Sequence, residues 1–328
     1  MRVKVTAPCR ADLAGGTLDI WPLPHLFPGS ATINVALDAL AEIEMEDGRP
    51  RWEVAAAGHD RAFDTLDALV SSPWALFGEI LQALPPPSPV RITVRRQPPS
   101  QSGLGGSSAV AAAVARGAAR LRGEDPPPDA LIALCRDAEA AVMGYPTGVQ
   151  DFYPPFYGGA NCIRYLRGRT DRSPLNLFPE LAGGMVLYHT GVPHHSGANN
   201  WQVVQRAIGD KGSETHRCLG LIAGLTGRLE AAFEAGDLER IGRLVMEEWR
   251  HRVRLHPSFA HPRIDQAVEA ALAAGAWGAK GCGAAGGGVV VVVTAPDRRT
   301  AVENALLPLP GRLLEAHPTT EGMRIEPC

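Results

Sequence analysis

Two carboxylates in the middle of the chain are of the type and spacing that a phosphoryl transfer needs. Glu139 falls at the border of the apolar stripe of a predicted helix, and Asp151 follows in a Gly/Pro loop with aromatic neighbours. Transfer of phosphate to a hydroxyl requires neutralised phosphate charge and an acceptor for the hydroxyl proton. Alone, Glu139 is also compatible with a solvated helix charge and Asp151 with a turn former. Asp19, beside a Gly-Gly turn, has the same ambiguity.

A polar Gly/Ser loop from Pro98 to Gly106 precedes a helix that we expect to begin near Ser107. Glycines allow successive backbone N–H groups to converge, and the start of a helix adds free N–H groups and a positive dipole end. The loop is therefore a candidate anion cradle, and the hydroxyls of Ser107 and Ser108 could ligate a magnesium ion. A flexible linker capped by serine is the alternative.

Other glycine patterns exclude two nucleotide-binding folds. The sequence has no GxxxxGK[ST], which excludes a Walker-type P-loop. Residues 281–286 match GxGxxG, but a dinucleotide fingerprint needs a strand before it and a helix after it. We expect a helical segment and a turn before it and the strand Val289 to Val293 after it. The match is not a Rossmann signal.

Composition excludes several other classes. The 328 residues are 45% hydrophobic and 20% charged, with a formal net charge of -3, so we expect no nucleic-acid or membrane partner. No apolar run is long enough to span a bilayer. Six cysteines lie far apart without a CxxC pair, which argues against a zinc cage or disulfide framework. With no apolar leader after the N-terminal charges, we expect a cytoplasmic protein.

Strands followed by grouped helices in each half predict an α+β class rather than an alternating parallel sheet. The charged segment Arg167 to Pro179 is a plausible seam, so we expect domains at residues 1–180 and 181–328. The predicted strands are 3–7, 31–46, 51–55, 90–96, 160–166, 185–190 and 289–293. Two helices are predicted to begin at the Ser72 cap and near Ser107. Further helices are predicted at 126–143, 198–208, 216–235, 238–253 and 263–274.

Four stretches of this chain, in this order, resemble the GHMP kinase superfamily, which includes galactokinase, homoserine kinase and mevalonate kinase. They are APCRADLAGGTLD (7–19), SGLGGSSAV (102–110), GYPTGVQDFYPPFYGGANCI (144–163) and KGCGAAGGGVVVVV (280–293). The run that starts at Met246 is similar to the D-glycero-D-manno-heptose 7-phosphate 1-kinase and fucokinase branch, which phosphorylates an anomeric hydroxyl. The resemblance implies an N-terminal domain like ribosomal protein S5 domain 2, a ferredoxin-like C-terminal domain and a site between them.

The resemblance also implies a role for each matching residue. Asp151, with Arg10 beside it, would be the base or the orienter of the attacking hydroxyl. Ser107 and Glu139 would hold magnesium. The nucleotide would be bound by Gly103, Leu104, Gly105, Gly106, Ser107 and Ser108, and the substrate by Gly16, Thr17, Asp19, Gly283 and Gly286.

Three departures from the family pattern narrow these expectations. Gly106 stands where many members carry a serine, Ala285 replaces a glycine, and Gly16-Thr17 replaces the Glu-His pair of galactokinases. Galactose is therefore a poor candidate. We expect a monomeric or homodimeric kinase that uses ATP and Mg²⁺ on a hydroxyl of a sugar or sugar phosphate, such as a heptose 7-phosphate or a deoxyhexose. The alternatives are a mevalonate-pathway kinase or decarboxylase, or a non-catalytic sugar sensor.

Overall fold

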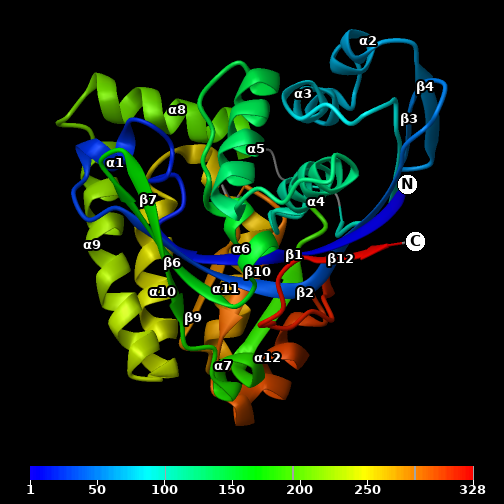
Figure 1. Ribbon diagram of the computed structural model, residues 1–328. Helices are drawn as coiled ribbons and strands as arrows, with labels where there is room; N and C mark the ends of the chain where they lie inside the picture. The colour runs from blue at the N-terminus through cyan, green and yellow to red at the C-terminus, as the bar shows by residue number, and fades with distance from the viewer. Residues whose placement is uncertain (100, 194–195, 284–285, 328) are drawn as a thin grey trace.

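Two β-sheets of different size organise the chain, and helices pack on both (Figure 1). The computed structural model describes residues 1–99, 101–193, 196–283 and 286–327. Strands and helices are grouped rather than alternating along a parallel sheet, as the α+β prediction requires.

The larger sheet is built around two long antiparallel strands, β1 and β2. In the described residues it has eight strands, in the order β12-β1-β2-β5-β3-β4, with β6 paired to the first half of β2 and β7 paired to β6. On the edge of β2 that faces away from β1, β6 pairs with the start of the strand and β5 pairs with its end. β2 is therefore hydrogen-bonded along most of its length. The strands are β1 (Arg2–Ala14), β2 (Ala31–Glu46), β3 (Trp52–Ala56), β4 (His59–Phe63), β5 (Arg91–Arg96), β6 (Ala160–Leu166), β7 (Arg169–Leu175) and β12 (Arg324–Pro327).

Helix α4 (Gly106–Leu121) packs on β1 and β2 in the core of this half of the molecule. Small residues, mostly alanine, allow it to approach the sheet closely, and its side chains are buried nearly all round. Arg116 on this helix is also buried, and it forms an ion pair with Asp125. The other helices of this half are α2 (Leu66–Val70), α3 (Ala75–Ala83), α5 (Pro128–Met143) and α6 (Tyr153–Tyr157), whereas α1 (Leu23–Leu26) contacts both β6 and α8 (Ser196–Gly209).

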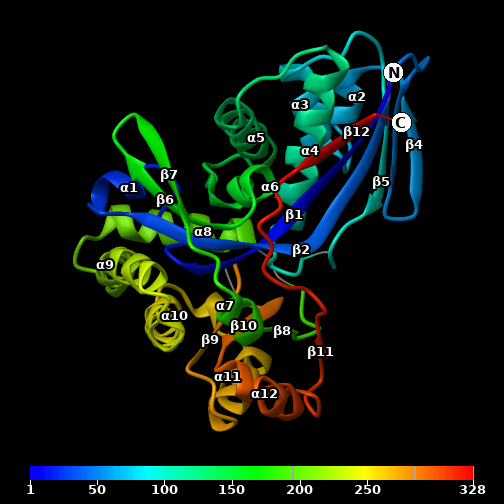
Figure 2. The same ribbon diagram turned by 60° about the horizontal axis from the view of Figure 1, so that its bottom comes forward.

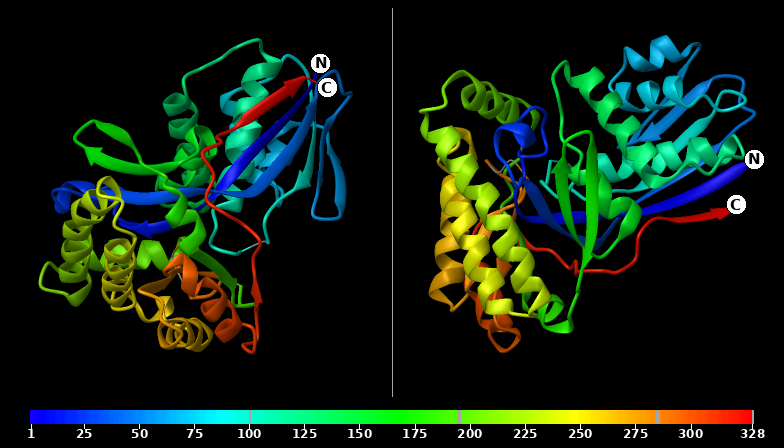
Figure 3. Two further views of the ribbon diagram at one scale, coloured as in Figure 1. Left: turned by 90° about the horizontal axis from the view of Figure 1, so that it is seen from below. Right: turned by 60° about the vertical axis from the view of Figure 1, so that its left-hand side comes forward.

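The smaller sheet is antiparallel, with the order β11-β8-β10-β9. Its central strand β10 (Val289–Val293) is buried on both faces, which explains five consecutive valines without alternation. Helix α10 packs on this sheet, as do α11 and α12, and α9 lies beside α10 (Figure 3). The elements are β8 (Met185–His189), α8 (Ser196–Gly209), α9 (Glu214–Glu234), α10 (Leu238–Arg252), α11 (Pro262–Ala273), β9 (Gly278–Gly281), α12 (Arg299–Leu306) and β11 (Arg312–Leu313).

The chain passes between the two sheets twice. It leaves the larger sheet through α7 (Pro179–Gly184) and enters β8. After β11 it returns, and β12 pairs with β1, so that the two termini lie side by side (Figure 2). The domain boundary at residue 180 stays a prediction, and β12 extends the first sheet from the far end of the chain.

Two expectations about local structure were wrong. We predicted no strand within residues 167–179, but this segment contains β7, which pairs with β6 along its whole length. On this strand Arg172 donates to the Asn161 side chain and lies over the ring of Tyr157. The GxGxxG pattern follows β9 rather than a helix and joins it to the antiparallel strand β10. A strand on both sides still excludes a Rossmann turn.

Candidate active site

All but two of the predicted site residues line one pocket of about 440 Å³. It is lined by segments distant in sequence: β1 and the turn after it, the loop before α4, helix α5, the loop before α6, and the turn after β9. Of the predicted residues, those that line it are Arg10, Gly16, Thr17, Asp19, Gly103, Gly105, Gly106, Ser107, Ser108, Glu139, Asp151 and Gly283. Ser107, Glu139 and Asp151 therefore share one cleft, as the phosphoryl-transfer hypothesis requires.

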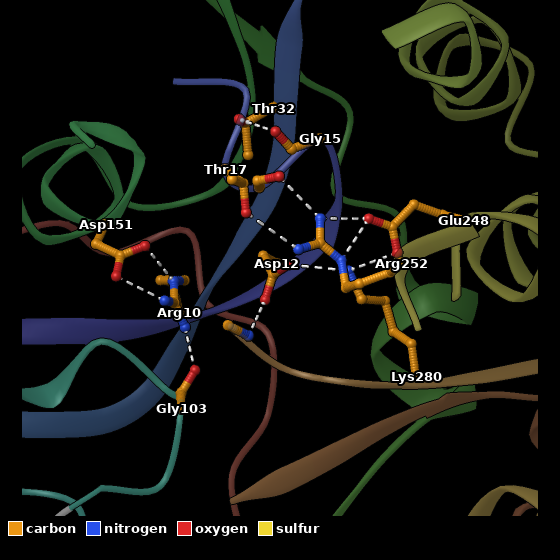
Figure 4. A network of polar contacts seen from close by, with 12 residues as sticks. Arg10, Asp12, Gly15, Thr17, Thr32, Gly103, Asp151, Glu248, Arg252 and Lys280 are labelled. Carbon is orange, nitrogen blue, oxygen red and sulfur yellow. Dashed lines mark hydrogen bonds and ion pairs between the residues drawn. The ribbon is translucent and has the colours of Figure 1, made fainter. Parts of the chain in front are cut away.

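Arg10 and Asp151 form a two-pronged ion pair in this pocket (Figure 4). The Arg10 Nε donates to Asp151 Oδ1 at 2.8 Å, and its Nη2 donates to Oδ2 at 2.7 Å. Burial alone would lower the pKa of Arg10, but the charges of Asp151 and Asp12 raise it. Because both carboxylate oxygens are held, the Asp151 side chain has a fixed orientation beside the pocket.

The loop before α4 has the backbone shape of an anion cradle. Gly103 and Gly105 have φ of 77° and 71°, a region that favours glycine, and Gly105 is the N-cap of α4. Arg10 Nη1 donates to the Gly103 carbonyl, and the Arg10 backbone N–H donates to the Leu104 carbonyl at 3.0 Å. Gly106, Ser107 and Ser108 at the start of this helix line the pocket, and the first N–H groups of a helix have no partner within it.

The turn after β9 packs directly against this loop. Val289 N donates to the Ser102 carbonyl at 2.8 Å, and a Cβ at Gly103 would lie 2.8 Å from the Cys282 carbonyl oxygen. Gly283 N donates to Asp12 at 2.5 Å and lines the pocket. Two predicted residues lie outside the pocket lining. The Leu104 side chain is in the core, and the Gly286 amide is bonded to the Phe259 carbonyl.

Carboxylates in the pocket outnumber the cations that pair with them. Burial, and then the charges of Asp151 and Asp19, raise the pKa of Glu139 to about 7. Burial, with a contribution from Asp151, raises the pKa of Asp19 to about 6, although the Gln150 backbone N–H donates to its Oδ2 at 3.0 Å. Raised pKa values in a cleft are typical of a site that receives a cation or takes part in proton transfer.

The donor set fits a magnesium ion that takes most of its ligands from phosphates. Across the residues that the structure describes, no group of three His, Cys, Asp or Glu side chains forms a ready-made metal cage. Magnesium bound through one or two protein oxygens plus nucleotide phosphates does not need one. Glu139 and Ser107 line the same pocket as the glycine turn, and a bound cation would offset the burial and the nearby Asp151 charge that raise the pKa of Glu139.

A buried ionic network behind the pocket was not predicted from the sequence. Lys280 Nζ lies 2.9 Å from Asp12 and 3.0 Å from Glu248, and Glu248 accepts two hydrogen bonds from Arg252 (Figure 4). Arg252 in turn contacts the Gly16–Thr17 turn that lines the pocket. One signal was available: Glu248 and Arg252 lie four residues apart on one helix, which allows contact but does not indicate burial.

Comparison with known proteins gives the family. Residues 71–159 match the GHMP kinases N terminal domain, and residues 229–310 match the GHMP kinases C terminal domain. The homoserine kinase of Thermococcus kodakarensis is 31% identical over 74% of each chain. The chain belongs to the GHMP kinase family. Members of this family are phosphotransferases that use ATP as the phosphate donor, and the expected two-domain GHMP kinase fold is confirmed.

Among the relatives of this GHMP kinase are enzymes with different acceptors. The D-glycero-alpha-D-manno-heptose 7-phosphate kinase of Campylobacter jejuni is 22% identical over 98% of both chains. The crystal structure of a D-glycero-D-manno-heptose 1-phosphate kinase from Bacteroides thetaiotaomicron superposes with a TM-score of 0.79, at 22% identity and 99% coverage of both chains. The family therefore indicates ATP as the donor and phosphoryl transfer as the class of reaction, but it does not identify the acceptor. None of the described helices is both long and apolar enough to cross a bilayer.

Proposed function

We propose that this GHMP kinase transfers the terminal phosphate of ATP to a hydroxyl, anomeric in the simplest case, of a sugar or sugar phosphate. The observation that carries the proposal is the bidentate Arg10–Asp151 pair, which lies in one pocket with the glycine turn and Glu139. A binding protein has no need for a fixed proton acceptor beside a phosphate cradle, so the enzyme is favoured over a sugar sensor.

The nucleotide end of the pocket is the glycine turn with the start of α4. Backbone N–H groups from Gly103 to Ser108 would hold the phosphates, aided by the positive end of the helix dipole. The side chains of Ser107 and Glu139 would hold Mg²⁺. When bound, this ion neutralises phosphate charge during the transfer. Ionised Glu139 supplies the negative charge that favours its binding.

The chemical step assigned to the chain's own residues is proton transfer at Asp151. One Asp151 oxygen accepts the proton of the attacking hydroxyl as the new O–P bond forms and the bond from the γ-phosphorus to ADP breaks. Arg10 holds that carboxylate in place through two hydrogen bonds, and its third contact reaches the Gly103 carbonyl. The same guanidinium thereby ties the proton acceptor to the phosphate loop.

The acceptor end is formed by Gly16, Thr17 and Asp19 on the turn after β1. A carboxylate beside a hydroxyl-bearing turn suits a polyhydroxylated ligand, because each ligand O–H can donate to Asp19. The similarity of this chain to the two heptose-phosphate kinases named above supports a polyhydroxylated acceptor. A cytoplasmic location and a monomeric or homodimeric state are part of the proposal and need separate measurements.

The test is an ADP-release screen with MgATP across aldoses, heptoses, deoxy sugars and their phosphates, with homoserine and mevalonate included. Phosphorus NMR of the product would show which oxygen carries the new ester. We expect a sugar or sugar phosphate to give the highest kcat/KM. Preferred turnover of homoserine or mevalonate would refute the sugar assignment. Release of carbon dioxide would indicate a decarboxylase, and ADP release by no acceptor would favour the sensor.

A further inference from the structure

The turn that lines the acceptor end of the pocket contains a residue in an unfavourable conformation. Thr17 is β-branched and has φ of 76°, a region that such residues rarely adopt. Its hydroxyl donates to Asn200 Oδ1 on α8 at 2.9 Å and lies 3.5 Å from Arg252 Nη1. Two residues from the second half of the chain, Asn200 and Arg252, therefore contact Thr17, whose backbone conformation needs support.

Arg252 reaches this turn from inside the protein. Its Nη2 donates to the Gly16 carbonyl at 2.9 Å, and its side chain is 0% exposed. A Cβ at position 16 would lie 3.3 Å from Arg252 Nη2 and 3.0 Å from Gln150 Nε2. The absence of a side chain at Gly16 thus leaves room for the guanidinium to approach the backbone.

The charge of Arg252 is balanced by a network that is buried throughout. Glu248 accepts from Arg252 Nε at 2.7 Å and lies 3.0 Å from Lys280, which is paired with Asp12. Two carboxylates and two cations balance one another. Burial alone would lower the pKa of Arg252, but Glu248 and Asp12 raise it. Buried charges are costly to desolvate, so such a network adds little net stability. Its more useful effect is to hold the groups that it contacts in one geometry.

We infer that Arg252 is a positioning residue for the acceptor: supported by Glu248, it holds Gly16 and Thr17 in the conformation that receives the substrate hydroxyls. This inference rests on the proposed function. The nucleotide turn has other supports, namely Arg10 on the Gly103 carbonyl and Val289 on the Ser102 carbonyl. Helix α10 of the second half would therefore set the affinity for the acceptor without setting the affinity for ATP.

The test uses the double variant Glu248→Gln/Arg252→Met, which removes one positive and one negative charge and leaves the Lys280–Asp12 pair in place. The matched control is Glu239→Gln/Arg243→Met, an i,i+4 pair on the same helix that is exposed to solvent. If the buried double variant fails to fold by circular dichroism, Arg252→Lys replaces it, because lysine keeps the charge but cannot form the same set of bonds.

Two readouts separate positioning from general stability. Hydrogen exchange follows the amides of Leu18 and Ile20, which are bonded to the Gly15 and Thr17 carbonyls at 3.2 and 3.1 Å. We expect these amides to exchange faster in the buried variant by about tenfold or more. With the acceptor found in the screen, we expect its KM to rise about 10- to 100-fold while the KM for ATP changes by less than about twofold. The control should change neither.

A second substitution tests whether Arg252 acts through the turn. Thr17→Val removes the hydroxyl that contacts Arg252 and keeps the shape, so the faster exchange that it causes at Leu18 and Ile20 should largely disappear as a separate effect in the Glu248→Gln/Arg252→Met background. Fully additive effects would overturn the inference, as would unchanged exchange at Leu18 and Ile20 or a parallel rise in both KM values. If the wild-type protein turns over no acceptor, the proposed function fails, and hydrogen exchange alone decides whether Arg252 holds the turn.

Discussion

Replacing Asp151 with asparagine tests the proposed proton acceptor with the least change of shape. Asparagine keeps the size of the side chain but removes its charge and one of its two acceptor oxygens. In the native protein both oxygens accept hydrogen bonds from Arg10, at 2.8 and 2.7 Å. The variant therefore loses the base and leaves one Arg10 N–H without its partner.

The two consequences differ in size. Loss of a charge-assisted hydrogen bond costs about 1.5–3 kcal/mol of unfolding free energy, and the lower end applies because the Asp151 side chain is 30% exposed. Loss of a general base lowers turnover by about 10²- to 10⁴-fold, which is about 2.7–5.4 kcal/mol in the activation barrier. Asp151→Asn should therefore remain folded and bind nucleotide, but turn over slowly.

The assay compares kcat for ADP release, the ADP dissociation constant and thermal unfolding for wild type, Asp151→Asn and the control Asp125→Asn. The control also neutralises the partner of a buried arginine, Arg116, but lies in the exposed loop between α4 and α5. We expect it to lose some stability and no turnover. Turnover of Asp151→Asn within about twofold of wild type would remove this residue from the mechanism. A parallel loss of ADP affinity would indicate instead that the phosphate loop had collapsed.

Three further predictions concern the cation and the acceptor. Ser107→Ala should raise the Mg²⁺ concentration for half-maximal ADP release, and an unchanged magnesium titration would contradict its role as a ligand. The pKa of Glu139 is raised from 4.5 to about 7, so its ionisation costs stability as the pH rises through this range. Glu139→Gln should therefore raise the Tm of the metal-free protein at pH 8, with a gain that shrinks toward pH 4; equal gains at both would contradict burial as the cause. In Gly148→Ala the new Cβ would lie 1.9 Å from Asp19 Oδ2, so acceptor KM should rise with little change in ATP KM.

Much of the secondary structure follows from local sequence pattern. The strands β2, β6 and β10 have the bounds that we predicted, because apolar β-branched residues and flanking turns mark their ends. β7 was missed because its sequence, RTDRSPL, is polar and contains a proline. It forms a strand because β6 pairs with it along its whole length. This pairing is a tertiary contact, and the local sequence preference of β7 does not predict it.

The site also has one part that local sequence motifs predict and another that depends on long-range packing. Short motifs contain Gly103, the residues from Gly105 to Ser108, Glu139 and Asp151, and the chemistry of these residues can be read from residue type and spacing. Their meeting in one pocket was an expectation that the geometry meets. The network of Asp12, Glu248 and Lys280 could not be predicted, because its members come from β1, α10 and β9. A charged residue on a helix or strand is normally solvated, and only long-range packing determines that these are buried.

The double passage of the chain between the sheets restricts how the pocket can open. One connection is α7, and the other is the segment between β11 and β12, where Thr319 N is bonded to the Ala36 carbonyl of β2. These two attachment points, together with the core that α9 and α10 share with β1 and β2, hold the two sheets in one arrangement around the pocket. Because the chain ends are adjacent on β1 and β12, a circular permutant that joins them and is cut at one attachment would release this restraint without changing any residue of the pocket.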